Sequence, residues 1–230
     1  MAPLVVDAEA VREFLDRAEQ AFPEPDWARL AAALDARRGQ ARKVFSSWDG
    51  RWSRAPAAIR LSEEERQRWE RLLEPHLAAI EAGDAVGFLR GVAPGDPPPW
   101  VVDWGTYWIS CLFPDRTWWA RWLYLPGSRT GALPLVLEEP EALEADPTLL
   151  GRYARVEQGV AFFGEVVASW RRLPQFPDPE RAMVGLALVY AVYLFTMAAW
   201  RMTTEFTQVL PPFSGVVRSL LGLKRWEEKV

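Results

Sequence analysis

The sequence predicts a mainly α-helical, bundle-like protein with a small antiparallel β-hairpin inserted near its middle. Apolar residues recur at helical spacing through the first and last thirds of the chain. Cap residues and prolines interrupt that pattern where helices should begin and end. The middle third contains two β-rich runs around a Pro-Gly turn. Because this middle part is the least regular, an α+β fold is the alternative.

Length and composition describe a globular chain. It has 230 residues, half of them hydrophobic and a quarter charged, which is typical of folded domains rather than of disordered ones. Cys111 is the single cysteine, so no disulfide can form within the chain, and we expect a cytoplasmic location. No basic segment precedes an apolar run at the N-terminus, so we expect no secretory signal.

The basic residues are strongly biased, with 24 Arg, three Lys and no Asn in the chain. A GC-rich genome produces such a bias. Selection for heat resistance would also disfavour Asn and Cys and enrich proline in loops. The composition is therefore compatible with a thermophilic source, with codon bias as the simpler alternative.

The N-terminal part is predicted to be helical. Asp7 is a suitable N-cap for a helix over residues 8–22, whose apolar side chains recur every three or four positions. Asp26 can cap a second helix that extends to about Val44. Residues 46–60 contain an Asp-Gly turn signal and a proline, so we expect a loop there.

Helix signals continue after this loop. Ser62 and Glu65 form a capping box at the start of the next helix. Pro75 is expected to end or kink that helix, and Asp84 can cap a further short turn. Residues 94–99 contain five prolines and glycines in six positions, and we interpret them as a linker.

This linker divides a helical part, residues 1–93, from residues 100–230, which we expect to combine a Trp-rich hairpin with further helices in one compact unit. Tryptophans four positions apart favour a helix over residues 100–113, although the aromatic density would also suit a strand. The two β-rich runs flank a turn near Gly127 to Gly131, which predicts a hairpin over residues 117–138.

Helices are predicted again in the last third of the chain. Residues 148–172 carry apolar side chains at helical spacing on one side. Asp178 followed by Pro179 is a preferred helix start. The helix that begins there includes residues 183–200, eighteen residues without a charge. A short helix over residues 214–226 completes the prediction.

The uncharged run over residues 183–200 leaves two interpretations open. As a helix it would rise about 27 Å, just short of the ~30 Å hydrocarbon core of a bilayer. Tyr190 and Tyr193 lie in its middle, whereas membrane helices place tyrosine near the interfaces. We therefore favour a buried central helix that packs against the amphipathic helix before it, with a membrane anchor as the alternative.

The sequence contains no catalytic signature. The single histidine, His76, and the single cysteine cannot form a zinc or redox-metal site of the usual ligand types, so we expect neither metal nor cofactor. No phosphate-binding glycine loop and no nucleophile elbow occurs. Carboxylate pairs such as Glu138 and Glu139 are common on protein surfaces, so an unrecognised carboxylate site is an alternative without specific support.

One functional hypothesis comes from the basic-aromatic segment, by which we mean residues 37–60. It carries seven basic residues and a single acid, in a chain of net charge −4. Cationic grooves with aromatic platforms are what binding of single-stranded nucleic acid requires. The residues predicted to form such a site are Arg37, Arg38, Arg42, Lys43, Trp48, Arg51, Trp52 and Arg54. The alternative is a helix end that pairs with the protein's own acidic surface.

Three hypotheses about function follow. We favour a non-enzymatic subunit or adaptor of a larger assembly, which binds a protein partner or a second copy of itself and contacts single-stranded nucleic acid through the basic-aromatic segment. A membrane-associated protein anchored by residues 183–200 is the second hypothesis, and an enzyme is the third. The clustered tryptophans in the middle of the chain would support a protein interface if several were exposed, but a role in the core is the more common one.

Overall fold

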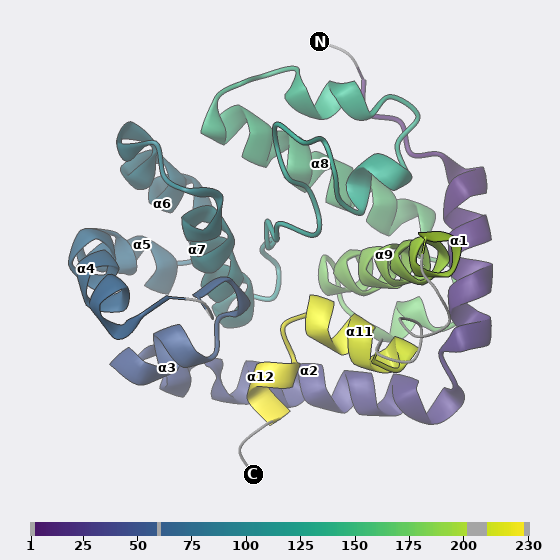
Figure 1. Ribbon diagram of the computed structural model, residues 1–230, viewed down its shortest axis with the longest axis horizontal. Coiled ribbons are helices and arrows are strands. Elements are labelled where there is room, and N and C mark those ends of the chain that lie inside the picture. The colour runs from purple at the N-terminus through teal and green to yellow at the C-terminus, as the bar shows by residue number, and fades with distance from the viewer. Residues whose placement is uncertain (1–2, 59–60, 202–210, 228–230) are drawn as a thin grey trace.

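The computed structural model describes residues 3–58, 61–201 and 211–227, and these residues form a mainly helical fold (Figure 1). The described residues contain no β-strand and only two isolated β-bridges. The predicted fold class is therefore confirmed as mainly α, while the predicted hairpin insertion is wrong.

The first two helices follow the sequence closely. α1 (Ala8–Ala21) begins after Asp7, whose carboxylate accepts two backbone N–H bonds of the first turn. α2 (Glu24–Phe45) begins two residues before the predicted cap at Asp26. Pro25 fits into its first turn, because the N–H group that proline lacks has no partner within a helix at that point.

The predicted loop over residues 46–60 contains a short helix instead. Ser47 caps α3 (Trp48–Ser53) by accepting a hydrogen bond from the backbone N–H of Gly50 at 3.1 Å, and a 3-10 turn, η1 (Pro56–Ala58), follows. A helix of six residues is too short to show a repeating apolar pattern. Its formation depends on tertiary contacts that the sequence does not display.

The next helices confirm the local signals. Both hydrogen bonds of the predicted capping box at Ser62 are present. Pro75 interrupts its helix with a 3-10 turn, and Asp84 caps the helix after it. The elements of this part are α4 (Glu63–Leu73), η2 (Glu74–His76), α5 (Leu77–Glu81) and α6 (Ala85–Val92).

The proline-rich stretch is a corner between two packed helices. η3 (Ala93–Gly95) leads into α7 (Pro99–Leu112), which confirms the helix favoured for residues 100–113. α7 contacts α2, α5 and α6. Gly105 permits close contact with α6, because a Cβ atom there would lie 2.1 Å from the ring of Phe88. Helices on both sides of the corner therefore share one core.

An irregular loop replaces the hairpin predicted over residues 117–138. Its turn does form, and Leu125 and Thr130 make an isolated bridge beside it. The second run continues into a 3-10 turn, η4 (Leu133–Leu135), rather than into a strand. η5 (Pro140–Glu144) follows.

The first run of the expected hairpin gives two of its backbone donors to α7 and pairs with the second run only close to the turn. The backbone N–H of Trp119 donates to Thr106 Oγ1 at 3.1 Å, and that of Arg121 donates to Asp103 Oδ2 at 3.4 Å. A β-ladder would need backbone donors of this kind for pairing with the second strand. Contacts with a helix therefore override the β-propensity of this run.

α8 and the C-terminal helices are shorter than predicted. α8 (Leu149–Val166) ends well before residue 172, and the chain then turns through η6 (Leu173–Gln175), which places Leu173 in the core. The single helix predicted for residues 214–226 is divided into two. These are α11 (Phe213–Leu220) and α12 (Lys224–Glu227), with Gly222 between them at a φ of 71°.

α9 (Glu180–Arg201) is the central helix and contains the uncharged run (Figure 1). It is contacted by α1, α8 and α11, and its side chains from residue 182 to 189 are buried. Among the described residues, Glu180–Ala198 is the one helical stretch long and apolar enough to cross a membrane. Its burial by three helices favours the core-helix interpretation. The Pro211-Pro212 pair predicts that this helix ends beyond Phe206, and that end lies outside the described residues.

The tryptophan-rich middle contributes mainly to the core. Trp104 and Trp108 from α7 and Trp118 and Trp119 from the following loop are all less than 5% exposed. Cys111 is buried as well and packs there as a small apolar residue. The core interpretation of the tryptophans is thus confirmed for these four.

Candidate functional site

The first half of the basic-aromatic segment is used for internal ion pairs. Arg37 is buried; its guanidinium donates to the carbonyl of Leu221 at 2.8 Å and lies 3.7 Å from the carboxylate of Glu180. Arg38 lies 3.3 Å from the same carboxylate and also pairs with Asp35. Both arginines therefore form ion pairs with carboxylates of the protein itself.

The second half of the segment is anchored by Glu70. Arg51 Nη2 and Trp52 Nε1 donate to its two oxygens at 2.5 and 2.8 Å. Burial raises the pKa of Glu70, against the effect of Arg51 and the two hydrogen bonds. Trp52 is 1% exposed and stacks on Trp104 with 5.2 Å between ring centroids. Its ring is therefore packed in the core, where a nucleic-acid base cannot stack on it.

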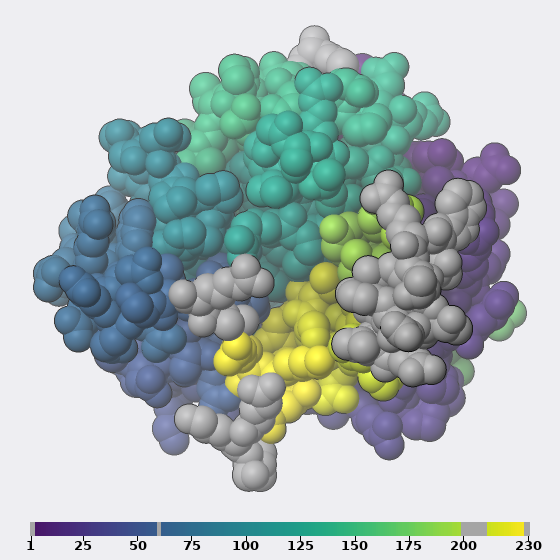
Figure 2. All heavy atoms as spheres, viewed as in Figure 1, coloured from purple at the N-terminus to yellow at the C-terminus, as the bar shows by residue number. Residues whose placement is uncertain are grey.

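Arginines of this segment also hold the C-terminal residues in place. Arg54 donates to the carbonyl of Arg225, and its guanidinium lies 6.0 Å from the ring centroid of Trp226. Together with the bond from Arg37 to Leu221, this contact fixes α11 and α12 beside the N-terminal helices. Figure 2 shows these C-terminal residues (yellow) on the surface next to the N-terminal part (blue).

Arg42, Lys43 and Trp48 are the predicted site residues that remain most accessible. Arg42 and Lys43 are exposed, and neither forms an ion pair with a described residue. Trp48 is half-buried, with its ring centroid 6.0 Å from that of Trp52. A nucleic acid would therefore meet two cations and part of one indole rather than the larger basic surface that the sequence suggested.

We expect Arg42, Lys43 and Trp48 to bind single-stranded RNA or DNA only weakly. This binding should disappear when Arg42 and Lys43 are both changed to Glu. Two phosphate contacts predict a log–log salt slope of about −1.4, taking about −0.7 per contact. Fluorescence anisotropy with labelled strands at two salt concentrations measures it. The matched control changes Arg12 and Arg90, which are also exposed. Binding that survives the Arg42 and Lys43 changes would contradict the assignment to this segment.

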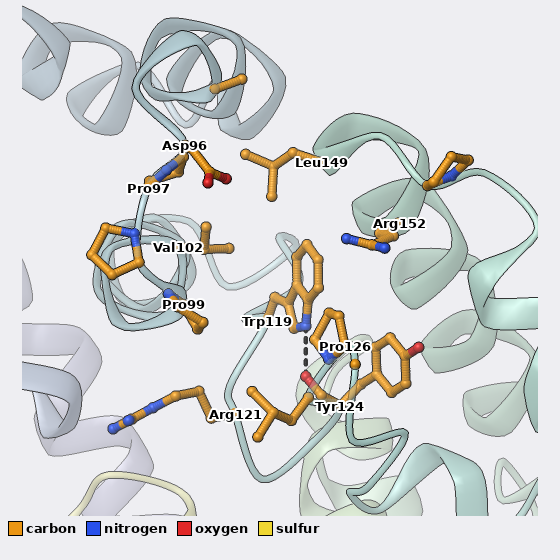
Figure 3. Close-up of a pocket in the computed structure, with 15 residues that line it drawn as sticks. Asp96, Pro97, Pro99, Val102, Trp119, Arg121, Tyr124, Pro126, Leu149 and Arg152 are labelled. Carbon is orange, nitrogen blue, oxygen red and sulfur yellow. Dashed lines mark hydrogen bonds between the residues drawn. The ribbon is translucent and has the colours of Figure 1, made fainter.

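A cleft of about 570 Å³ lies in another part of the molecule (Figure 3). Three segments form it: the proline corner before α7, the loop after residue 118 and the start of α8. Its walls are mostly apolar, and they include Pro97, Pro99, Val102, Trp119, Pro126 and Leu149. The prolines and glycines of the corner predict a linker, and nothing in their pattern indicates a cleft built from three separate segments.

Several side chains that line the cleft have little conformational freedom. Proline fixes its own φ angle near −65°, so the proline side chains are held in place by the backbone. Trp119 is 4% exposed and donates from Nε1 to the carbonyl of Tyr124 at 2.9 Å (Figure 3). These side chains would therefore lose little conformational freedom when a ligand binds.

Arg152 projects into the cleft from the first turn of α8 (Figure 3). Its Nε and Nη2 atoms both lie 3.1 Å from Oε2 of Glu144, and the hydroxyl of Tyr124 donates to Oε1 of Glu144. Burial favours a higher pKa for Glu144, but the bonds from Tyr124 and Arg152 outweigh it, so the pKa is lowered. The carboxylate therefore stays ionised at neutral pH and fixes the guanidinium.

Asp103, on α7, fixes the segment of the chain on either side of Trp119. It is 5% exposed and accepts hydrogen bonds from Trp118 Nε1 at 2.8 Å and from Arg121 Nε at 3.2 Å. Burial raises the pKa of Asp103, against the effect of these donors. The position of Asp103 within an apolar helix could have indicated this cluster from the sequence, because a charged residue at a core position is normally paired. The guanidinium of Arg121 points away from Trp119 (Figure 3).

The described residues contain no cluster of three or more His, Cys, Asp or Glu side chains that could hold a metal ion. Comparison of the chain with protein-family models, with curated proteins and with solved structures finds no match. The assignment of a function therefore depends on the geometry of the basic-aromatic segment and of the cleft.

Proposed function

We propose that the chain is a non-enzymatic subunit or adaptor of a larger assembly, and that it binds an extended segment of a partner protein in the cleft beside Trp119. The cleft itself carries the proposal, because it combines about 570 Å³ of space with apolar walls and a fixed guanidinium. Binding sites typically have this composition, in which apolar walls provide contact area and a few polar groups fix orientation.

The limited conformational freedom of several cleft side chains supports a binding role. A ligand loses less free energy on binding when the receptor does not have to become ordered. The prolines offer no N–H donors, so recognition must depend on packing and on the few polar groups nearby. A segment with apolar side chains would pack well against these walls.

Arg152 and the carboxylate that holds it also suit positioning better than proton transfer. A general acid or base works best with a pKa near the working pH. The pKa of Glu144 is lowered instead, because Tyr124 and Arg152 donate to its ionised form. Its oxygens are used to orient Arg152, which is what a recognition site requires.

A display selection from a random library of twelve-residue peptides tests the proposal. We expect recovered peptides to bind the wild-type chain and to lose at least about tenfold in affinity when Leu149→Trp fills the cleft, since that corresponds to about 1.4 kcal/mol of lost packing. The matched control is Leu72→Trp, because Leu72 is 52% exposed on α4. Isothermal titration calorimetry measures the affinities, and circular dichroism checks that both variants are folded.

Two results would refute this function for the cleft. One is a selection that recovers no binding peptide, and the other is a set of peptides that bind the Leu149→Trp and Leu72→Trp variants equally well. A second copy of the chain is the alternative partner. It predicts a dimer of the wild-type chain in sedimentation experiments that Leu149→Trp dissociates.

A further inference from the structure

We infer that the segment bound in the cleft carries one carboxylate and that Arg152 binds this carboxylate through the free edge of its guanidinium. This inference rests on the proposed function, since it names the chemistry of the ligand for the same cleft. It also makes Arg152 the residue that determines specificity.

The geometry of Arg152 carries the inference. A guanidinium has five N–H donors along its edges. Glu144 occupies the edge formed by Nε and Nη2, with both atoms 3.1 Å from its Oε2 atom. No described residue accepts a hydrogen bond from Nη1, and the side chain is 30% exposed. The end formed by Nη1 and Nη2 is therefore open for the two-point contact that carboxylates make with arginine.

Arg152 is held in place before any ligand arrives. Tyr124 fixes Glu144, and Glu144 fixes the guanidinium, so little side-chain freedom remains to be lost on binding. Arg152 also lies in the first turn of α8, after the Thr148 cap. The positive end of the helix dipole adds a favourable potential for an anion at this position.

The surroundings of Arg152 select for one carboxylate rather than several. Asp96 borders the cleft from the wall opposite Arg152, and Glu144 already neutralises much of the positive charge (Figure 3). A second acidic group, or a nucleic-acid backbone, would face these carboxylates. An apolar segment with a single acidic group can pack against the apolar walls and also bind Arg152 through its carboxylate.

Peptides recovered in the selection allow a direct test with calorimetry. Each acidic side chain is replaced by its amide, and separately the C-terminal carboxylate is replaced by an amide. One of these two replacements should reduce the affinity for the wild-type chain by about 10- to 100-fold, as expected for a charge-assisted two-point hydrogen bond. The two arms distinguish a side-chain carboxylate from a chain terminus.

The same peptides are then titrated against variants of the protein. Arg152→Gln should reduce the affinity for the acid form by the same factor and leave the amide form unchanged. The affinity of Arg152→Lys for the acid form should lie between those of the wild type and Arg152→Gln, because lysine keeps the charge but cannot make the two-point contact. Asp96→Asn should improve binding of peptides with two acids severalfold. Arg12→Gln, an exposed arginine of α1, is the control and should change nothing.

The comparison of acid and amide forms separates recognition from folding, since an unfolded variant would lose both forms equally. If Leu149→Trp abolishes binding but amide peptides bind as tightly as acid peptides, the cleft is the binding site and the carboxylate inference is wrong. If Leu149→Trp has no effect, or if no peptide is recovered, the proposed function and this inference both fail.

Discussion

Replacing Arg37 by Ala should lower the free energy of unfolding by about 3–5 kcal/mol, which is the usual cost of leaving one member of a buried ion pair alone. Glu180, its partner, is 6% exposed, and burial raises the pKa of Glu180 against the effect of Arg37 and Arg38. Without Arg37, Glu180 keeps Arg38 alone, and the carbonyl of Leu221 loses its donor. Urea denaturation followed by circular dichroism measures the change.

Arg38→Ala is the matched control. Arg38 pairs with the same carboxylate, but 29% of its side chain is exposed, so solvent screens much of the interaction. We expect this variant to lose less than about 1 kcal/mol, in the range of exposed ion pairs. The double change of Arg37 to Met and Glu180 to Gln should recover part of the loss, because it removes both buried charges. Equal stability of the Arg37→Ala and Arg38→Ala variants would contradict this account.

The helix starts could be predicted from the sequence because their causes are local. Asp7 and Ser62 cap the helices that follow them through atoms two or three residues away. Pro75 interrupts its helix through the chemistry of its own ring. Helix ends of this kind can therefore be predicted without knowing the rest of the fold.

The missing hairpin shows where local information ends. The run of residues 117–124 has the composition of a strand, and the turn after it forms. Two of its backbone donors are bound by Thr106 and Asp103, which lie on a different element, so they are not available for a ladder. Only tertiary structure places those acceptors beside the run.

The candidate sites were hard to predict for the same reason. The arginines of the basic-aromatic segment look solvated in the sequence, yet their partners Glu70, Glu180 and Leu221 lie far along the chain. The cleft is built from three separate segments, and its central arginine, Arg152, is oriented by Glu144. Residue types alone indicated charge and aromaticity but not which of these groups were already paired.

Trp52→Ala should destabilise the protein by about 3–5 kcal/mol, as is typical when a large aromatic side chain is removed from a core. Trp52 is 1% exposed, stacks on Trp104 at 5.2 Å and donates to Glu70. Trp48→Ala is the matched control; Trp48 is half-buried at the start of the same helix, and we expect a loss of about 1–2 kcal/mol. Thermal and urea unfolding measured by circular dichroism give both values.

Trp52→Phe separates the two contributions of this side chain. Phenylalanine keeps most of the ring contact with Trp104 but cannot donate to Glu70, so the remaining loss should be about 1–3 kcal/mol. A tryptophan that served to stack on a nucleic-acid base would behave in the opposite way: its removal would weaken binding and leave stability nearly unchanged. A Trp52→Ala variant as stable as wild type would therefore contradict the core role. The burial of the ring and its part-buried hydrogen bond to Glu70 instead predict a clear loss of stability.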